Sequence, residues 1–179
     1  TTITKQVRVY EPQVSFQTNP QNGCAPLTVN FTNNTTSLAP VVNWQWSFGI
    51  PGAFSGAQDT SYIYTLPGSY DITLKATDSI GCSNAITKPN EVFVSQPIPD
   101  FFAQYPINCP NNPLTFTNTS SGSGLTYLWD FGDNNTSNAF NPTHTYTAPG
   151  SYTVTLTITD FQGCDSTIIL PNYITIADP

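Results

Sequence analysis

An internal repeat is the feature of this sequence that most constrains its fold. CAPLTVNFTN at 24–33 is matched by CPNNPLTFTN at 109–118, and WQWSFG at 44–49 by YLWDFG at 127–132. YTLPGSYDITLKATDSIGC at 64–82 is matched in turn by YTAPGSYTVTLTITDFQGC at 146–164. The spacing between matching segments changes only slightly along the chain. Such a repeat indicates two copies of one domain.

The copies set the expected domain boundaries at residues 11–95 and 96–179. ITKQVRVYEP at 3–12 also resembles ITKPNEVFVSQP at 86–97, which ends the first copy. Residues 1–10 are therefore either the last strand of a preceding repeat or the N-terminal strand of the first domain.

Apolar and polar residues alternate within each copy. In SYTVTLTITD at 151–160, the side chains of Tyr152, Val154 and Leu156 fall on one face and threonines fall on the other, which is typical of a half-buried strand. Phe31 and Phe116 are expected to point inward from earlier strands. The PGS segments are expected to form turns, because proline presets φ and glycine accepts positive φ. Several short strands per copy predict an all-β fold of antiparallel β-sandwiches.

Charge excludes one class of partner. The net charge is -7 and the chain has only four Lys and Arg residues, so it lacks the basic footprint that nucleic acid requires. No apolar run approaches the roughly 20 residues that span a bilayer, and the first residues lack the order of a signal peptide. We expect a soluble chain with no direct membrane insertion, and an internal piece of a longer protein fits these features.

Candidate catalytic groups are few. His144 is the one histidine, and Tyr62 stands at its position in the first copy. A structural role is therefore expected for His144, and we predict no catalytic residue and no enzyme.

Asp130 and Asp133 in YLWDFGDNN at 127–135 are the candidate metal ligands, because carboxylate oxygens suit Ca²⁺. The alternative is that they accept backbone N–H bonds at a turn, which the intervening glycine favours. The first copy lacks both acids. No cofactor is predicted, and calcium stays the alternative at these two residues.

Five aromatic residues could stack on sugars if their rings were exposed. Three coplanar exposed rings on one sheet would favour this hypothesis, whereas aromatics at alternating positions usually belong to the core. The candidates are Tyr10, Tyr105, Tyr127, Phe140 and Phe161.

WDFGD, NPTHTY and PGSYTVTLTITD, in that order and spacing, resemble the PKD domain, an immunoglobulin-like sandwich of extracellular proteins. The first copy departs from the pattern at Ser47, which replaces the first Asp, and at IPGAFSG. GCAPLTVNFTN and TDSIGC further resemble the variant repeated in large surface proteins of Bacteroidetes, including gliding-motility adhesins. The resemblance implies two tandem immunoglobulin-like sandwiches arranged end to end.

Four cysteines, two at equivalent places in each copy, indicate oxidation and an extracellular, cell-surface location. In the sandwich that the resemblance implies, Cys24 precedes one strand and Cys82 follows another that runs in the same direction. The two cysteines then lie at opposite ends of the domain, about one strand length apart, which is too far for a disulfide. We predict that Cys24 bonds Cys164 across the domain junction, and that Cys82 and Cys109 point toward neighbouring repeats. The intradomain pairs Cys24–Cys82 and Cys109–Cys164 are the alternative.

The resemblance implies a non-catalytic structural and adhesive stalk of a large secreted or cell-surface bacterial protein, of the kind that serves gliding or adhesion. Its expected partners are the adjacent repeats of the same chain. A second expected partner is surface polysaccharide, or a host or other substratum. The alternative is an accessory module of a secreted hydrolase that binds polysaccharide or protein. The family setting also makes Ser79 and Ser166 candidate O-glycosylation sites, both expected in the loop that follows the PGSY strand.

Overall fold

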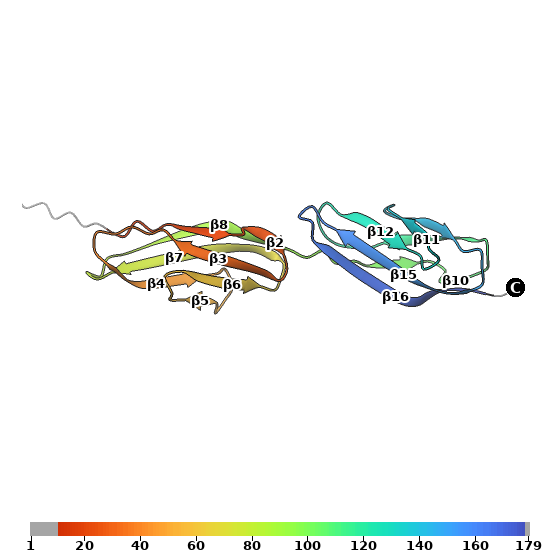
Figure 1. The fold of residues 1–179 in the computed structure, drawn as a ribbon, viewed down its shortest axis with the longest axis horizontal. Helices are drawn as coiled ribbons and strands as arrows, with labels where there is room; N and C mark the ends of the chain where they lie inside the picture. Colours follow the sequence, from red (N-terminus) through yellow and green to blue (C-terminus); the bar gives the residue numbers. More distant parts are fainter. Residues whose placement is uncertain (1–10, 178–179) are drawn as a thin grey trace, which may run out of the picture. The chain divides into compact units, whose positions relative to one another are not determined.

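The computed structural model describes residues 11–177, and the chain divides into two compact units, Thr1–Val94 and Ser95–Pro179. We call these units domain 1 and domain 2 and describe each by itself (Figure 1). The strand predicted at residues 1–10 lies outside the described residues.

Each domain contains short strands joined by turns. Domain 1 consists of β1 (Phe16–Asn19), β2 (Asn22–Cys24), β3 (Leu27–Asn33), β4 (Val41–Ser47), β5 (Phe54–Ser55), β6 (Thr60–Tyr64), β7 (Gly68–Asp78) and β8 (Ser83–Ser95), whose last residue is the first residue of domain 2. Domain 2 consists of β9 (Phe101–Ala103), β10 (Ile107–Asn108), β11 (Pro113–Asn118), β12 (Thr126–Asp130), β13 (Thr136–Ser137), β14 (Thr143–Thr145), β15 (Gly150–Thr159) and β16 (Asp165–Ile176). The predicted all-β fold with two β-sandwiches is confirmed.

Two sheets face each other in each domain. In domain 1 the orders are β1-β3-β6 and β2-β8-β7-β4-β5, and in domain 2 they are β14-β11-β9 and β10-β16-β15-β12-β13. The long strands pair antiparallel, but β10 pairs parallel with the end of β16, through Ile107 opposite Thr175. The sequence analysis did not predict this parallel pair, because β10 is too short to show a period.

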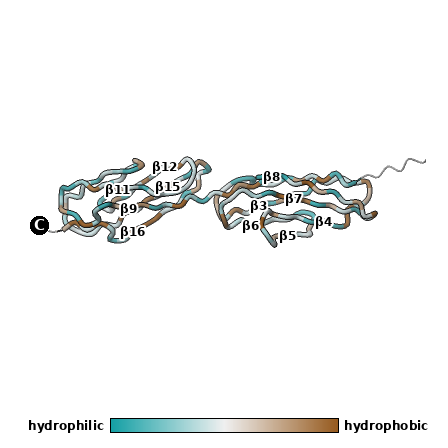
Figure 2. The backbone as a smooth tube through the Cα atoms, turned by 180° about the vertical axis from the view of Figure 1, so that it is seen from behind, coloured by the Kyte–Doolittle hydropathy of each residue, from teal (hydrophilic) through white to brown (hydrophobic). Residues whose placement is uncertain are grey.

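The core of each sandwich is aromatic. In domain 1, Trp46 is buried between Phe16 and Phe31, and in domain 2 Trp129 is buried between Phe101 and Phe116. The inward orientation predicted for Phe31 and Phe116 is confirmed. Apolar and polar residues follow each other along the strands (Figure 2), as expected when one side of each strand is buried.

The polar atoms of the large buried rings all have partners. The indole N–H of Trp46 donates to the carbonyl of Ala57 at 2.9 Å, and that of Trp129 donates to Ala139 at 2.9 Å. The hydroxyl of Tyr64 donates to the Phe48 carbonyl at 3.1 Å. Burial raises the pKa of Tyr64, so its hydroxyl stays a neutral donor. The Tyr146 hydroxyl likewise donates to the Phe131 carbonyl, so these bonds fix the turns after β4 and β12 and the segments after β5 and β13 to the core.

Candidate binding face

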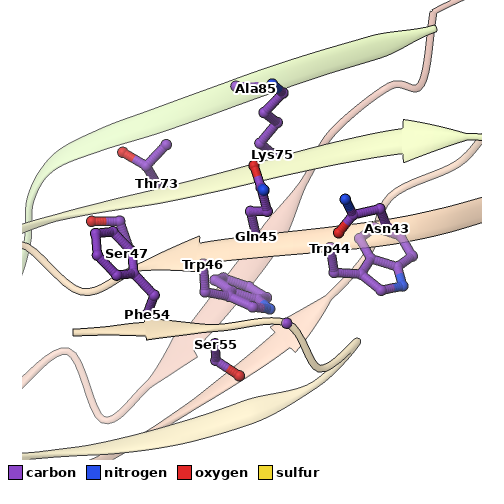
Figure 3. Close-up of a pocket in the computed structure, with 11 residues that line it drawn as sticks. Asn43, Trp44, Gln45, Trp46, Ser47, Phe54, Ser55, Thr73, Lys75 and Ala85 are labelled. Carbon is purple, nitrogen blue, oxygen red and sulfur yellow. The ribbon is translucent and has the colours of Figure 1, made fainter. Parts of the chain in front are cut away.

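The outward side of the five-stranded sheet in domain 1 carries a shallow depression of about 600 Å³. Because side chains alternate along β4, Trp46 enters the core while Gln45 and Ser47 face solvent. The register places Gln45 opposite Lys75 on β7 and Ser47 opposite Thr73. We call this depression the β4–β7 groove, and Figure 3 shows its lining side chains.

Phe54 forms one wall of the groove. It lies opposite Ser47 in the β4–β5 pair, and its side chain is 71% exposed (Figure 3). The turn before it contains Gly49, whose φ is +77°, and a side chain there would collide with the Asp71 backbone. This turn brings the chain back as β5 at the edge of the sheet, so that Phe54 points outward.

The remaining wall and floor are polar. Asn43, Gln45 and Thr73 supply amide and hydroxyl groups, while the half-buried Trp44 packs against the core on the other side of β4. Lys75 supplies a positive charge. Among the described Lys and Arg residues, Lys88 is paired with Glu91 at 3.3 Å, whereas no ion pair involves Lys75. The groove therefore presents an exposed ring, hydrogen-bonding groups and one cation.

Domain 2 presents a different face at the same positions. Leu128 and Thr157 pair where domain 1 has Gln45 and Lys75, and Thr136 stands where domain 1 has Phe54. Ile169 is exposed beside Thr155. This face has neither the ring nor the cation of the β4–β7 groove.

Asp130 and Asp133 hold the turn after β12. Asp130 accepts the N–H of Gly132 at 2.9 Å, and Asp133 accepts the N–H of Asn135 at 3.2 Å through one oxygen. These are the bonds that the turn interpretation expects. Within residues 11–177 no group of three or more His, Cys, Asp or Glu residues is placed to hold a metal ion.

His144 completes this turn. Its Nε2 lies 2.8 Å from the second oxygen of Asp133, and its ring stacks on Phe131 with centroids 4.2 Å apart. Partial burial acts to raise the pKa of Asp133, but the hydrogen bonds from His144 and Asn135 outweigh it and leave the pKa below its usual value. In domain 1, Tyr62 stacks on Phe48 in the same way. The geometry gives His144 a structural contact.

The other predicted rings do not form a platform. Tyr105 and Phe161 are exposed, and Phe140 packs edge-on against Tyr127 with centroids 5.4 Å apart. Tyr10 lies outside the described residues.

The cysteines fall into two groups. Cys24 and Cys164 are disulfide-bonded, whereas Cys82 and Cys109 are free. Cys24 ends β2, which lies beside β8, and Cys164 follows β15. The predicted pairing across the domain junction stays a prediction, since each domain is described by itself.

Ser79 and Ser166 occupy different environments. Ser79 is exposed in the turn between β7 and β8. Ser166 is half-buried within β16 and pairs with Ile158, so the expectation that both serines lie in the connecting loop is wrong for Ser166. In both domains the return strand begins one residue after the second cysteine, at Ser83 and at Asp165, so Ser79 precedes its strand whereas Ser166 lies within it. Within residues 11–177, no helix is long and apolar enough to cross a membrane.

The sequence analysis missed the residues of the β4–β7 groove. Alternation alone marks Gln45 and Lys75 as exposed, but it does not show that they are neighbours across two strands. Phe54 gave one signal: it lies in IPGAFSG, the segment that departs from the pattern of the second copy.

Two sandwiches with the tryptophan and tyrosine contacts described above define this protein as a pair of immunoglobulin-like β-sandwich modules. The I-band fragment I67-I69 from titin shares the fold at 14% identity and a TM-score of 0.52, over 92% of this chain and 66% of that one. The chain belongs to the PKD domain family, which matches residues 9–94 and 95–175.

Two of the named relatives each match a short stretch of the chain. Collagenase ColA of Bacillus cereus is 48% identical over 50 residues, which is 28% of this chain and 5% of that protein. Pre-pro-metalloprotease PrtV of Vibrio cholerae is 53% identical over 53 residues, covering 28% of this chain and 6% of that protein. This chain therefore corresponds to only a small fraction of either relative.

Proposed function

We propose that this PKD pair is a non-catalytic accessory module of a secreted hydrolase, and that the β4–β7 groove of domain 1 binds fibrous protein. The observation that carries the proposal is the exposed ring of Phe54 beside Gln45 and the cation of Lys75. Similarity to a collagenase and a metalloprotease supports a protein substrate rather than a polysaccharide.

The groove chemistry fits an extended polypeptide. Gln45 and Asn43 can exchange hydrogen bonds with peptide groups, while Phe54 can pack against proline or aliphatic side chains. Lys75 can pair with acidic side chains, and its contribution should weaken as salt rises. An extracellular location rests on the disulfide-bonded state of Cys24 and Cys164.

Co-sedimentation with collagen fibrils tests this function. The wild-type chain should sediment with the fibrils, and Phe54→Ala should weaken binding by about tenfold or more, as for a buried aromatic anchor. Phe161→Ala is the matched control, because Phe161 is an exposed ring of domain 2. Unchanged binding by Phe54→Ala would overturn the groove assignment. Binding to cellulose or chitin but not to collagen would replace fibrous protein by polysaccharide.

A structural stalk within a larger bacterial surface protein is the second candidate, of the gliding or adhesion type found in Bacteroidetes. The disulfide-bonded state of Cys24 and Cys164 favours it, because a bond between these two residues would staple the domains across the proline-containing linker SQPIPD. Adjacent repeats would then be its main partners. Peptide mapping without reduction tests the staple: a Cys24–Cys164 peptide is expected, and a Cys24–Cys82 peptide would contradict it.

A further inference from the structure

One end of domain 1 gathers exposed apolar side chains. The N–H of Ser79, in the β7–β8 turn, donates to the Pro40 carbonyl at 2.8 Å and holds that turn beside the segment before β4. Leu38 is 80% exposed and Ile80 74% exposed there, and Val42 is also exposed. We call this end, which includes Asp78 and Cys82, the N-pole of domain 1.

Asp78 has an unused buried acceptor at the N-pole. Asp78 is 1% exposed, and its Oδ1 accepts the N–H groups of Ile80 at 3.0 Å and Cys82 at 2.9 Å. Its Oδ2 is buried without a hydrogen-bond partner among the described residues. A buried carboxylate oxygen without a donor is unfavourable, so a donor from outside domain 1 would be bound favourably.

Domain 2 has the same loop, and there both side-chain oxygens of the equivalent aspartate accept hydrogen bonds. Asp160 accepts the N–H groups of Gln162 and Cys164 through Oδ1, as Asp78 does in domain 1. Its Oδ2 accepts the hydroxyl of Ser95. The cysteines differ in the same sense: Cys164 is buried and disulfide-bonded, whereas Cys82 is free and partly exposed. The loop of domain 1 therefore has an unused acceptor and a free thiol at the positions where the loop of domain 2 has a filled acceptor and a disulfide-bonded cysteine.

The end of domain 2 that contains Cys109 also gathers exposed apolar side chains and a free cysteine. Cys109 is free and exposed, and it follows β10, whose Ile107 side chain is exposed. Tyr105 is exposed close by in sequence. The N–H of Ala177 donates to the Asn108 carbonyl at 2.9 Å, which fixes this region beside the end of β16. We call this end the C-pole of domain 2. Its equivalent cysteine in domain 1, Cys24, is disulfide-bonded.

We propose that the N-pole of domain 1 is a docking site for the C-pole of another PKD domain, and that a second copy of this chain can occupy it. The contact would join Cys109 of one copy to Cys82 of the next and bury the apolar side chains of both poles. A donor of the incoming pole would satisfy Asp78. Because the two surfaces differ, the contact is heterologous and can repeat head to tail.

The two cysteines form their disulfide by thiol–disulfide exchange. With oxidised glutathione as the oxidant, one cysteine thiolate attacks a glutathione sulfur and releases one reduced glutathione. The thiolate of the second cysteine then attacks the mixed disulfide and releases the other reduced glutathione. The two protein thiols lose two protons and two electrons, and glutathione disulfide takes up both electrons. In an oxidising compartment, a protein disulfide donor would serve as the oxidant.

Incubation of the whole chain with oxidised and reduced glutathione tests the proposal. We expect a ladder of oligomers by light scattering and gel electrophoresis without reduction, with peptides linking Cys82 to Cys109. Peptides linking Cys82 to Cys82, or Cys109 to Cys109, as often as Cys82 to Cys109 would overturn it, since random collision would then explain the ladder. A chain that stays monomeric would also overturn it.

Paired variants sharpen the test. Cys82→Ser alone and Cys109→Ser alone should each stay monomeric, while an equal mixture of the two should stop at a dimer. Ile80→Ser should slow dimer formation in that mixture by about tenfold, because docking buries this side chain. Ile63→Ser, at an exposed site elsewhere in domain 1, is the matched control. Equal slowing by both would contradict docking at the N-pole. The β4–β7 groove plays no part in these measurements, so their failure leaves the proposed function standing.

Discussion

The two domains share a skeleton and differ in the turn that follows their central tryptophan strand. The indole bonds of Trp46 and Trp129 have the same length, and Tyr64 and Tyr146 bond equivalent carbonyls. After β4, domain 1 continues with IPGAFSG and turns Phe54 out to solvent. After β12, domain 2 continues with DNNTSNA and uses Asp133 to bind His144. The shared contacts fold the sandwich, and the divergent turn decides which side chains its outer face presents.

Replacement of the central tryptophans tests the shared skeleton and should have the largest effect. Trp46→Ala and Trp129→Ala each leave a large cavity and an unpaired carbonyl, so each should destabilise its own domain by about 3–5 kcal/mol. Hydrogen exchange followed by mass spectrometry reports on each domain separately. If one variant lost less than half the unfolding free energy that the other variant loses, the two tryptophans would not play equivalent roles.

The corner tyrosines should show a smaller but matched effect. Tyr64→Phe and Tyr146→Phe each remove a buried hydroxyl and leave the carbonyl of Phe48 or Phe131 without its donor. Each should cost about 1–3 kcal/mol in the free energy of unfolding of its domain. Denaturant unfolding of each variant measures the loss, with Tyr105→Phe, at an exposed site, as a control expected to change little.

Acidification should reveal the difference between the turns. The folded pKa of Asp133 lies below its unfolded value, so its contribution is present above the unfolded pKa and is lost as pH falls through the folded one. Domain 2 should therefore lose stability below a pH of about 4, near the unfolded pKa of aspartate. Asp133→Asn should flatten this loss in domain 2 and leave domain 1 unchanged. An unaltered pH profile in the variant would show that this carboxylate does not carry the effect.

Phe54 should have the smallest effect on stability. Because its side chain is mostly exposed, Phe54→Thr, which installs the residue of domain 2, should change the free energy of unfolding by no more than about 0.5 kcal/mol. Thermal unfolding checks this. A larger loss would mean that Phe54 packs in the core and is unavailable to a ligand.

Much of this comparison could be predicted from the sequence. The repeat and the period of two define two sandwiches, and the missing acids in the first copy show that Asp130 and Asp133 are not part of the shared skeleton. The outward position of Phe54 could not be predicted, because it depends on the path of a glycine-containing turn and on a two-residue edge strand. The neighbourhood of Gln45 and Lys75 depends on strand register, which is set by pairing between distant segments. The unsatisfied oxygen of Asp78 likewise appears only when burial and hydrogen bonds are known.

Under the proposed function, the β4–β7 groove of domain 1, and not the equivalent face of domain 2, binds a fibrous polypeptide. Titration of the isotope-labelled chain with a collagen-like triple-helical peptide, followed by NMR chemical shifts, tests it most directly. The account predicts that the largest shifts fall at Gln45, Phe54 and Lys75 and disappear in Phe54→Thr. Shifts centred on Leu128 and Thr157 of domain 2, or unchanged in Phe54→Thr, would contradict it.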